Sequence, residues 1–227
     1  MRHLSDRRVA TFFAFVLASG LCVSLVAIRA WHAGSDGYRF LVWNLILAWI
    51  PFLLALVFYD GWRRGRSWPA LAALGGLWLL FLPNAPYLVT DLVHLGTIPG
   101  APLWYDGAMI SAFAATGLLL ALASVFLVHT VALRTLGPRL GWVVPVVALG
   151  LCSAGVIVGR FGRLNSSDAI LRPGRLAAFT VRHVADPLAS GRALALTLAY
   201  GAFLVIAYVV LYAVSSLRPD DVPDGRR

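Results

Sequence analysis

Six stretches of the chain contain no charged residue and are long enough to cross a membrane as helices. They cover residues 9–28, 40–59, 67–90, 107–133, 140–159 and 193–217. Each reaches the roughly 20 residues that an α-helix needs to cross a hydrocarbon core about 30 Å thick. Barrel strands would instead show ten-residue segments of alternating polarity. The pattern therefore predicts an all-α, polytopic transmembrane helical bundle that forms a single membrane domain over residues 1–227, with six transmembrane helices at about 9–30, 40–59, 67–90, 107–133, 140–159 and 193–217.

The composition agrees with a membrane protein and limits the classes of binding partner that are expected. Hydrophobic residues make up 60% of the chain, charged residues 13%, and the mean hydropathy is +0.81. The net charge of +9 is the excess of 19 arginines over ten aspartates, and the chain has no lysine. These arginines are spread over the connections rather than massed in one soluble domain, so nucleic acid is not an expected partner. The expected partners are membrane lipids with anionic headgroups.

The arginine distribution predicts the orientation. Eleven arginines lie in the N-terminal segment, the second and fourth connections and the C-terminal tail, whereas the first connection has two and the third none. The positive-inside rule then places both termini in the cytoplasm, and we expect a bacterial cytoplasmic membrane. The fifth connection is an exception, because it carries six arginines on the predicted extracytoplasmic side. We expect this connection to have a role that outweighs the topological bias.

The third and fifth connections must emerge on the same face, and they carry opposite charge. The third supplies the candidate ligand-binding residues Asp91, His94 and Asp106, and the fifth supplies Arg160, Arg163, Asn165 and Asp168. Two guanidinium groups suit a small anion or a lipid headgroup, which the acidic and imidazole groups would help to orient. Alternatively, the two loops form salt bridges only with each other.

Asp91, His94 and Asp106 also have the ligand chemistry of a metal site. Three such ligands suffice for catalytic zinc. However, the Asp-x-x-His spacing is short and common in proteins. We therefore assign no metal, and the cofactor is unknown.

A doubly broken segment, Pro83-Asn84-Ala85-Pro86-Tyr87, lies near the end of the third apolar run. A helix ending before Pro83 would be about 22 Å long, which is too short to span the bilayer, so the break should lie at membrane depth. Neither proline can donate a backbone hydrogen bond. The segment predicts irregular backbone, with Asn84 as a candidate to satisfy freed groups. A proline kink without any ligand is the alternative.

The fifth connection, residues 160–192, contains a further amphipathic pattern. Arg175, Phe179, Arg182 and Asp186 recur at helical spacing and end before Pro187. This pattern predicts a short interfacial helix between the fifth and sixth transmembrane helices.

Three motifs resemble those of a bacterial family known as domain of unknown function 1361. They are Phe81-Leu82-Pro83-Asn84-Ala85-Pro86-Tyr87-Leu88-Val89-Thr90-Asp91-Leu92-Val93-His94-Leu95, then Trp104-Tyr105-Asp106, then Gly159-Arg160-Phe161-Gly162-Arg163-Leu164-Asn165-Ser166-Ser167-Asp168. The resemblance covers roughly residues 40–186, and Ser167 departs from it because relatives often carry Trp there. It implies a bacterial multi-pass membrane protein and supplies no activity.

Three functions are compatible with these observations. The first is transport or sensing of a small polar or anionic ligand at the extracytoplasmic face. The second is an enzyme that acts on a lipid or cell-envelope substrate, with His94 as general base oriented by Asp91. The third is a structural or assembly partner without a ligand site.

Overall fold

The structure is a computed structural model that describes residues 2–162, 174 and 187–216, and within these ranges the chain is helical and contains no strand. The elements are α1 (Arg2–Ala33), α2 (Arg39–Arg63), α3 (Trp68–Phe81), α4 (Asn84–Thr90), the 3₁₀ helix η1 (Asp91–His94), α5 (Leu103–Gly141), α6 (Val143–Gly162) and α9 (Pro187–Ser216). They provide six spans that are long and apolar enough to cross a membrane. The prediction of an all-α chain with six such helices is confirmed.

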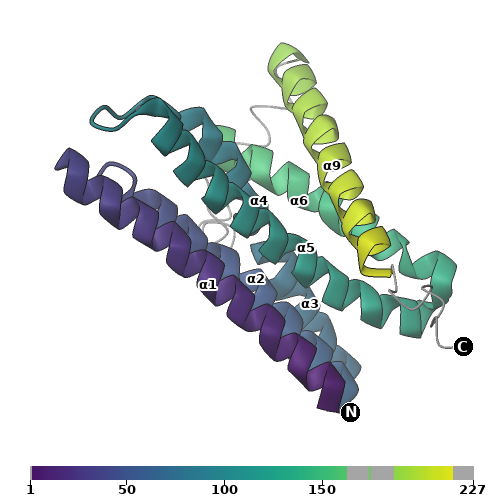
Figure 1. Cartoon of the computed structure of the whole chain (residues 1–227). Helices are drawn as coiled ribbons and strands as arrows, with labels where there is room; N and C mark the ends of the chain where they lie inside the picture. Colours follow the sequence, from purple (N-terminus) through teal and green to yellow (C-terminus); the bar gives the residue numbers. More distant parts are fainter. Residues whose placement is uncertain (1, 163–173, 175–186, 217–227) are drawn as a thin grey trace, which may run out of the picture.

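Helix α5 is the centre of the bundle (Figure 1). It packs against α2 and α4 on one side and against α6 on the other, while α1 and α9 lie at the periphery. In the most apolar stretch of α5, 56% of the residues are buried, compared with 11% in α1 and 17% in α9. The outer helices consequently expose large apolar side chains such as Leu17 and Ile206. Such surfaces suit lipid rather than water.

The third span is interrupted at the predicted place, but its backbone stays close to helical. Leu82 and Pro83, between α3 and α4, both keep right-handed helical dihedral angles. Because Pro86 has no N–H, the Leu82 carbonyl accepts from the Ala85 N–H instead, at 3.2 Å in a tighter i→i+3 bond. The predicted interruption is therefore present, but it is limited to one tight turn, with helical dihedral angles, that rejoins α3 and α4.

Two glycines allow the neighbouring helices to approach this turn closely. A Cβ atom on Gly117 of α5 would clash with the Ala85 carbonyl oxygen, and one on Gly155 of α6 would lie 2.6 Å from Pro83 Cγ. Real Cβ atoms do not come so near. The broken span is thus packed between α5 and α6 at positions where only glycine fits.

Most helix ends differ from the predicted ones by several residues: α1 and α2, for example, extend to Ala33 and Arg63. Helix α5 begins at Leu103, and Gly137 adopts φ 81° and ψ 173° before Pro138, so the turn into α6 starts there. Helix α6 then begins at Val143 and α9 at Pro187. The amphipathic interfacial helix expected within residues 160–192 falls mostly outside the described residues and stays a prediction.

Candidate functional site

The end of α6 meets the end of the broken span at Arg160. The Arg160 Nη1 donates to Asp91 Oδ1 at 3.2 Å and to the Tyr87 hydroxyl at 3.4 Å. Its Nη2 lies 3.3 Å from His94 Nε2. Tyr87, Asp91 and His94 recur every three to four residues, so α4 and η1 present all three side chains on one face. We call these four residues the Arg160 cluster.

Asp91 is held from two helices at once. Besides Arg160, it accepts from Asn44 Nδ2 of α2 at 2.8 Å. Its side chain is 1% exposed, whereas that of Arg160 is 21% exposed. The carboxylate is therefore enclosed, while part of the guanidinium still faces outward.

The orientation of His94 follows from its neighbours. A guanidinium has only donors, so His94 Nε2 must accept from Arg160, and the proton of the neutral imidazole lies on Nδ1. The Phe40 ring packs edge-on against the imidazole, with centroids 5.1 Å apart. The carbonyl of His94 accepts from the Tyr38 hydroxyl at 2.9 Å and from Thr97 Oγ1 at 2.7 Å. The residue is thus fixed at both its backbone and its ring.

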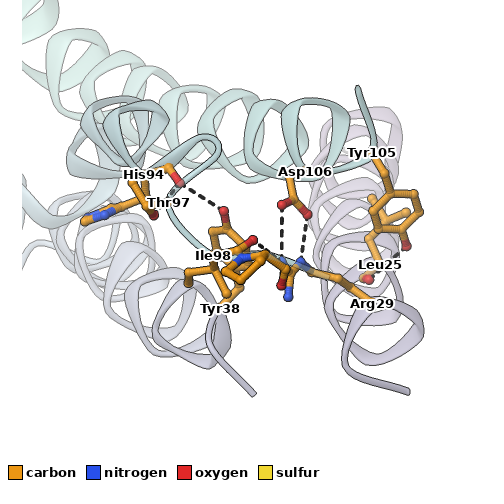
Figure 2. Close-up of polar contacts among 9 residues, drawn as sticks. Leu25, Arg29, Tyr38, His94, Thr97, Ile98, Tyr105 and Asp106 are labelled. Atoms are coloured by element: carbon orange, nitrogen blue, oxygen red, sulfur yellow. Dashed lines mark hydrogen bonds and ion pairs between the residues drawn. The ribbon is translucent and has the colours of Figure 1, made fainter. Parts of the chain in front are cut away.

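A second arginine–aspartate pair lies at the same end of the bundle and is closed (Figure 2). Arg29 of α1 donates from Nε to Asp106 Oδ1 at 2.7 Å and from Nη2 to Oδ2 at 3.2 Å. Its Nη2 also reaches the carbonyls of Ile98 and Pro99. The two side chains are only 1% and 2% exposed. This bidentate pair joins α1, the connection at residues 95–102 and the first turn of α5.

Tyr38 lies between the Arg29–Asp106 pair and His94 (Figure 2). The Arg29 guanidinium lies over the Tyr38 ring, 4.4 Å from its centroid. The Tyr38 hydroxyl donates to the carbonyl of His94. Burial, with the nearby Asp106 carboxylate, raises the pKa of the Tyr38 phenol above its ordinary value. The phenol therefore stays protonated near neutral pH and remains a donor to His94.

The structure groups the predicted residues differently from the sequence. Asp91, His94 and Arg160 come together, whereas Asp106 pairs with Arg29 and not with Asp91 and His94. Asn84 begins α4 and is half-buried, about two helical turns before Asp91. Within the described part of the chain, no group of three or more His, Cys or Asp residues is placed to hold a metal ion. The predicted residues Arg163, Asn165 and Asp168 lie outside the described residues.

Sequence reasoning missed Asn44, Arg29, Tyr38 and Tyr87. Asn44 had a usable signal, because it is the one side-chain amide in the charge-free run 40–59. An amide in a membrane helix normally needs a partner. Arg29 had no such signal in the sequence, since an arginine at the end of an apolar run is typical of a residue that reaches the membrane surface. Its burial against Asp106 depends on packing that the local sequence does not specify.

The fold and the site define a multi-pass helical membrane protein with two arginine–aspartate pairs at one end of its bundle. The chain belongs to the DUF1361 family, described as a protein of unknown function, which it matches over residues 43–207. The matched segment contains Asn44, Asp91, Asp106 and Arg160, and it begins after α1. No curated protein and no solved structure matches the chain.

Proposed function

We propose that the protein binds a small anionic group at the Arg160 cluster, in a transport or sensing role. We further propose that this end of the bundle faces the outside of a bacterial cytoplasmic membrane, with both termini in the cytoplasm. The orientation rests on the arginine distribution, which favours the other end as the cytoplasmic one.

The observation that carries the proposal is the contrast between the two arginines. Arg29 is enclosed and bound to both oxygens of its carboxylate, as in a structural pair. Arg160 is partly exposed and contacts Asp91 through Nη1 only, at 3.2 Å, while its Nη2 faces a neutral imidazole nitrogen at 3.3 Å. Charge-assisted bonds from a guanidinium to an oxyanion are shorter, about 2.7–2.9 Å, and roughly twice as strong as neutral ones. An oxyanion is therefore a better acceptor for Nη2 than His94 is.

Charge balance adds a requirement. Asp91 already neutralises Arg160, so an anion bound there leaves the cluster with one net negative charge. A second cation favours binding, and Arg163 follows Arg160 by three residues. We assign Arg163 this role, with Asn165 and Asp168 completing the predicted loop.

The catalytic alternative has less support from this geometry. A general base needs a free lone pair and, in the proposed version, a carboxylate that orients it. Here His94 Nε2 accepts from Arg160, and the guanidinium lies between the imidazole and Asp91. Arg160 therefore occupies the position from which His94 would take a proton.

Phosphate-dependent thermal stabilisation tests the proposal. The purified full chain is heated in phosphate-free detergent buffer, and tryptophan fluorescence is followed as inorganic phosphate replaces chloride at constant ionic strength. A ligand that binds the folded state alone raises Tm with concentration. We expect such a rise for the wild type and its loss in Arg160→Lys, which keeps a positive charge beside Asp91 but loses the planar fork.

Arg39→Lys is the matched control, because Arg39 lies in an exposed pair with Asp36 at the same end of the bundle. We expect it to respond to phosphate like the wild type. Absence of any wild-type response, or an equal response in Arg160→Lys, would reject the anion site. Copurification of a protein partner that is unchanged by Arg160→Lys would instead favour the structural role.

A further inference from the structure

The described residues enclose a cavity of about 270 Å³ between the last turn of α1 and the first turn of α5. Its walls are mainly apolar and come from Ile28, Trp31, Ala101, Pro102 and Trp104. The cavity opens to the outside of the bundle. It is separate from the Arg160 cluster and shares none of its residues.

The lining contains three polar residues, Arg29, His32 and Tyr105, and two of them are hydrogen-bonded to other parts of the protein. Arg29 directs Nε and Nη2 at Asp106 and at the carbonyls of the connection at residues 95–102. Its Nη1 has no hydrogen-bond partner among the described residues, but this nitrogen is itself buried. The Tyr105 hydroxyl donates to the Leu25 carbonyl at 3.0 Å (Figure 2). A water-soluble polar molecule would therefore lose its hydration without gaining comparable hydrogen bonds.

The position of the cavity also indicates its occupant. Trp31 and Trp104 flank it and are 87% and 73% exposed. Exposed tryptophans at the end of membrane helices mark the boundary between the hydrocarbon core and the headgroups. Ile28 lies about 8 Å below the end of α1 at helical rise, so the cavity extends into the upper part of the hydrocarbon layer.

We propose that this cavity binds the upper part of one acyl chain of a membrane phospholipid. An apolar cavity of about 150 Å³ stays free of water and accepts an apolar guest such as benzene. The present cavity is larger, and it opens where acyl chains are present at high concentration. An unfilled void loses the dispersion contacts of its walls, and an acyl chain restores them.

Photo-crosslinking in lipid nanodiscs tests this assignment. The full chain is reconstituted with a phosphatidylglycerol that carries a diazirine near the carboxyl end of one acyl chain, and labelled peptides are mapped by mass spectrometry. We expect several-fold enrichment of label on residues 28–32 and 101–105 over the lipid-facing surface of α1 around Leu17, which is 74% exposed. The same lipid with a diazirine at the terminal methyl should show no such enrichment.

Two variants fill the cavity and one serves as control. Ala101→Trp and Ile28→Trp each place a large side chain in the lining, and we expect either to reduce the label to the level around Leu17. Ala115→Trp lies on an exposed position about three turns beyond Trp104 on the same helix α5 and should leave the enrichment intact. Fluorescence-detected size exclusion identifies any variant that fails to fold, and the two filling variants replace each other in that case.

Two labelling results would overturn the assignment. One is uniform labelling along α1 in the wild type. The other is enrichment that persists in a folded filling variant. Efficient disulfide crosslinking between two chains that each carry Ile28→Cys would also overturn it, by identifying a second copy as the occupant. The phosphate response of the Arg160 cluster is independent of these results.

Discussion

The buried pair of Arg29 and Asp106 should dominate the stability of the contact between α1 and α5. Both side chains are almost fully enclosed, at 1% and 2% exposure, and they share two hydrogen bonds. Removing one partner leaves an uncompensated charge in the interior, which costs about 3–5 kcal/mol in comparable buried pairs. We expect a loss of this size in the free energy of unfolding for Arg29→Met and again for Asp106→Leu.

The double variant should be more stable than either single variant. Arg29→Met combined with Asp106→Leu leaves no buried charge, and replacing a buried ion pair by apolar residues is often neutral or stabilising. Arg29 also contacts the carbonyls of Ile98 and Pro99 and the ring of Tyr38, and these contacts are lost. The double variant should therefore remain somewhat less stable than the wild type.

Equilibrium unfolding in mixed micelles measures these values. The fraction of denaturing detergent is raised, and far-ultraviolet circular dichroism follows the loss of helix. Asp36 and Arg39 provide a matched exposed pair, at 69% and 75% exposure, for which the same cycle should give about 0–1 kcal/mol. The reasoning is refuted if both pairs give the same small loss, or if the double variant at Arg29 and Asp106 loses the sum of the two single values.

Two further predictions concern the broken span. Gly117→Ala places a methyl group against the Ala85 carbonyl and should lower the free energy of unfolding by about 1–3 kcal/mol. Gly76 has open space around it, so Gly76→Ala should raise the free energy of unfolding by up to about 1 kcal/mol. Equal effects of the two in the micelle assay would contradict the close packing. Asn44→Leu removes a donor from the enclosed carboxylate of Asp91 and should cost about 1–3 kcal/mol in the same assay. A neutral outcome would show that Asn44 does not support Asp91.

The number of membrane-spanning helices could be predicted because the length of each charge-free run can be read directly from the sequence. A charge-free run of about 20 residues is sufficient evidence for a span. The helix ends were less accurate, since the turn between α5 and α6 depends on the left-handed conformation of Gly137 just before Pro138. A Gly-Pro pair indicates a turn but does not give the residue at which the next helix resumes.

Only the charged and titratable residues of the candidate site could be predicted from the sequence. Asp91, His94 and Arg160 could be placed on one face because helix parity assigns alternate connections to the same side. Asp106 was assigned to the same group because it lies in the same connection, yet it pairs with Arg29 across the bundle. Asn44 carries no charge and was overlooked in an apolar run, although it donates directly to Asp91.

The Arg29–Asp106 pair also constrains the order in which the protein is assembled. The two residues are 77 positions apart, so at synthesis rates of about 5–20 residues per second Asp106 is made roughly 4–15 s after Arg29. During this interval the guanidinium has no carboxylate partner, and its place near the end of α1 lets it stay among the headgroups. Helix α1 can therefore pack against α2 early, through contacts such as that of Ser19 with Trp49, whereas its Arg29 end docks only after α5 has been made.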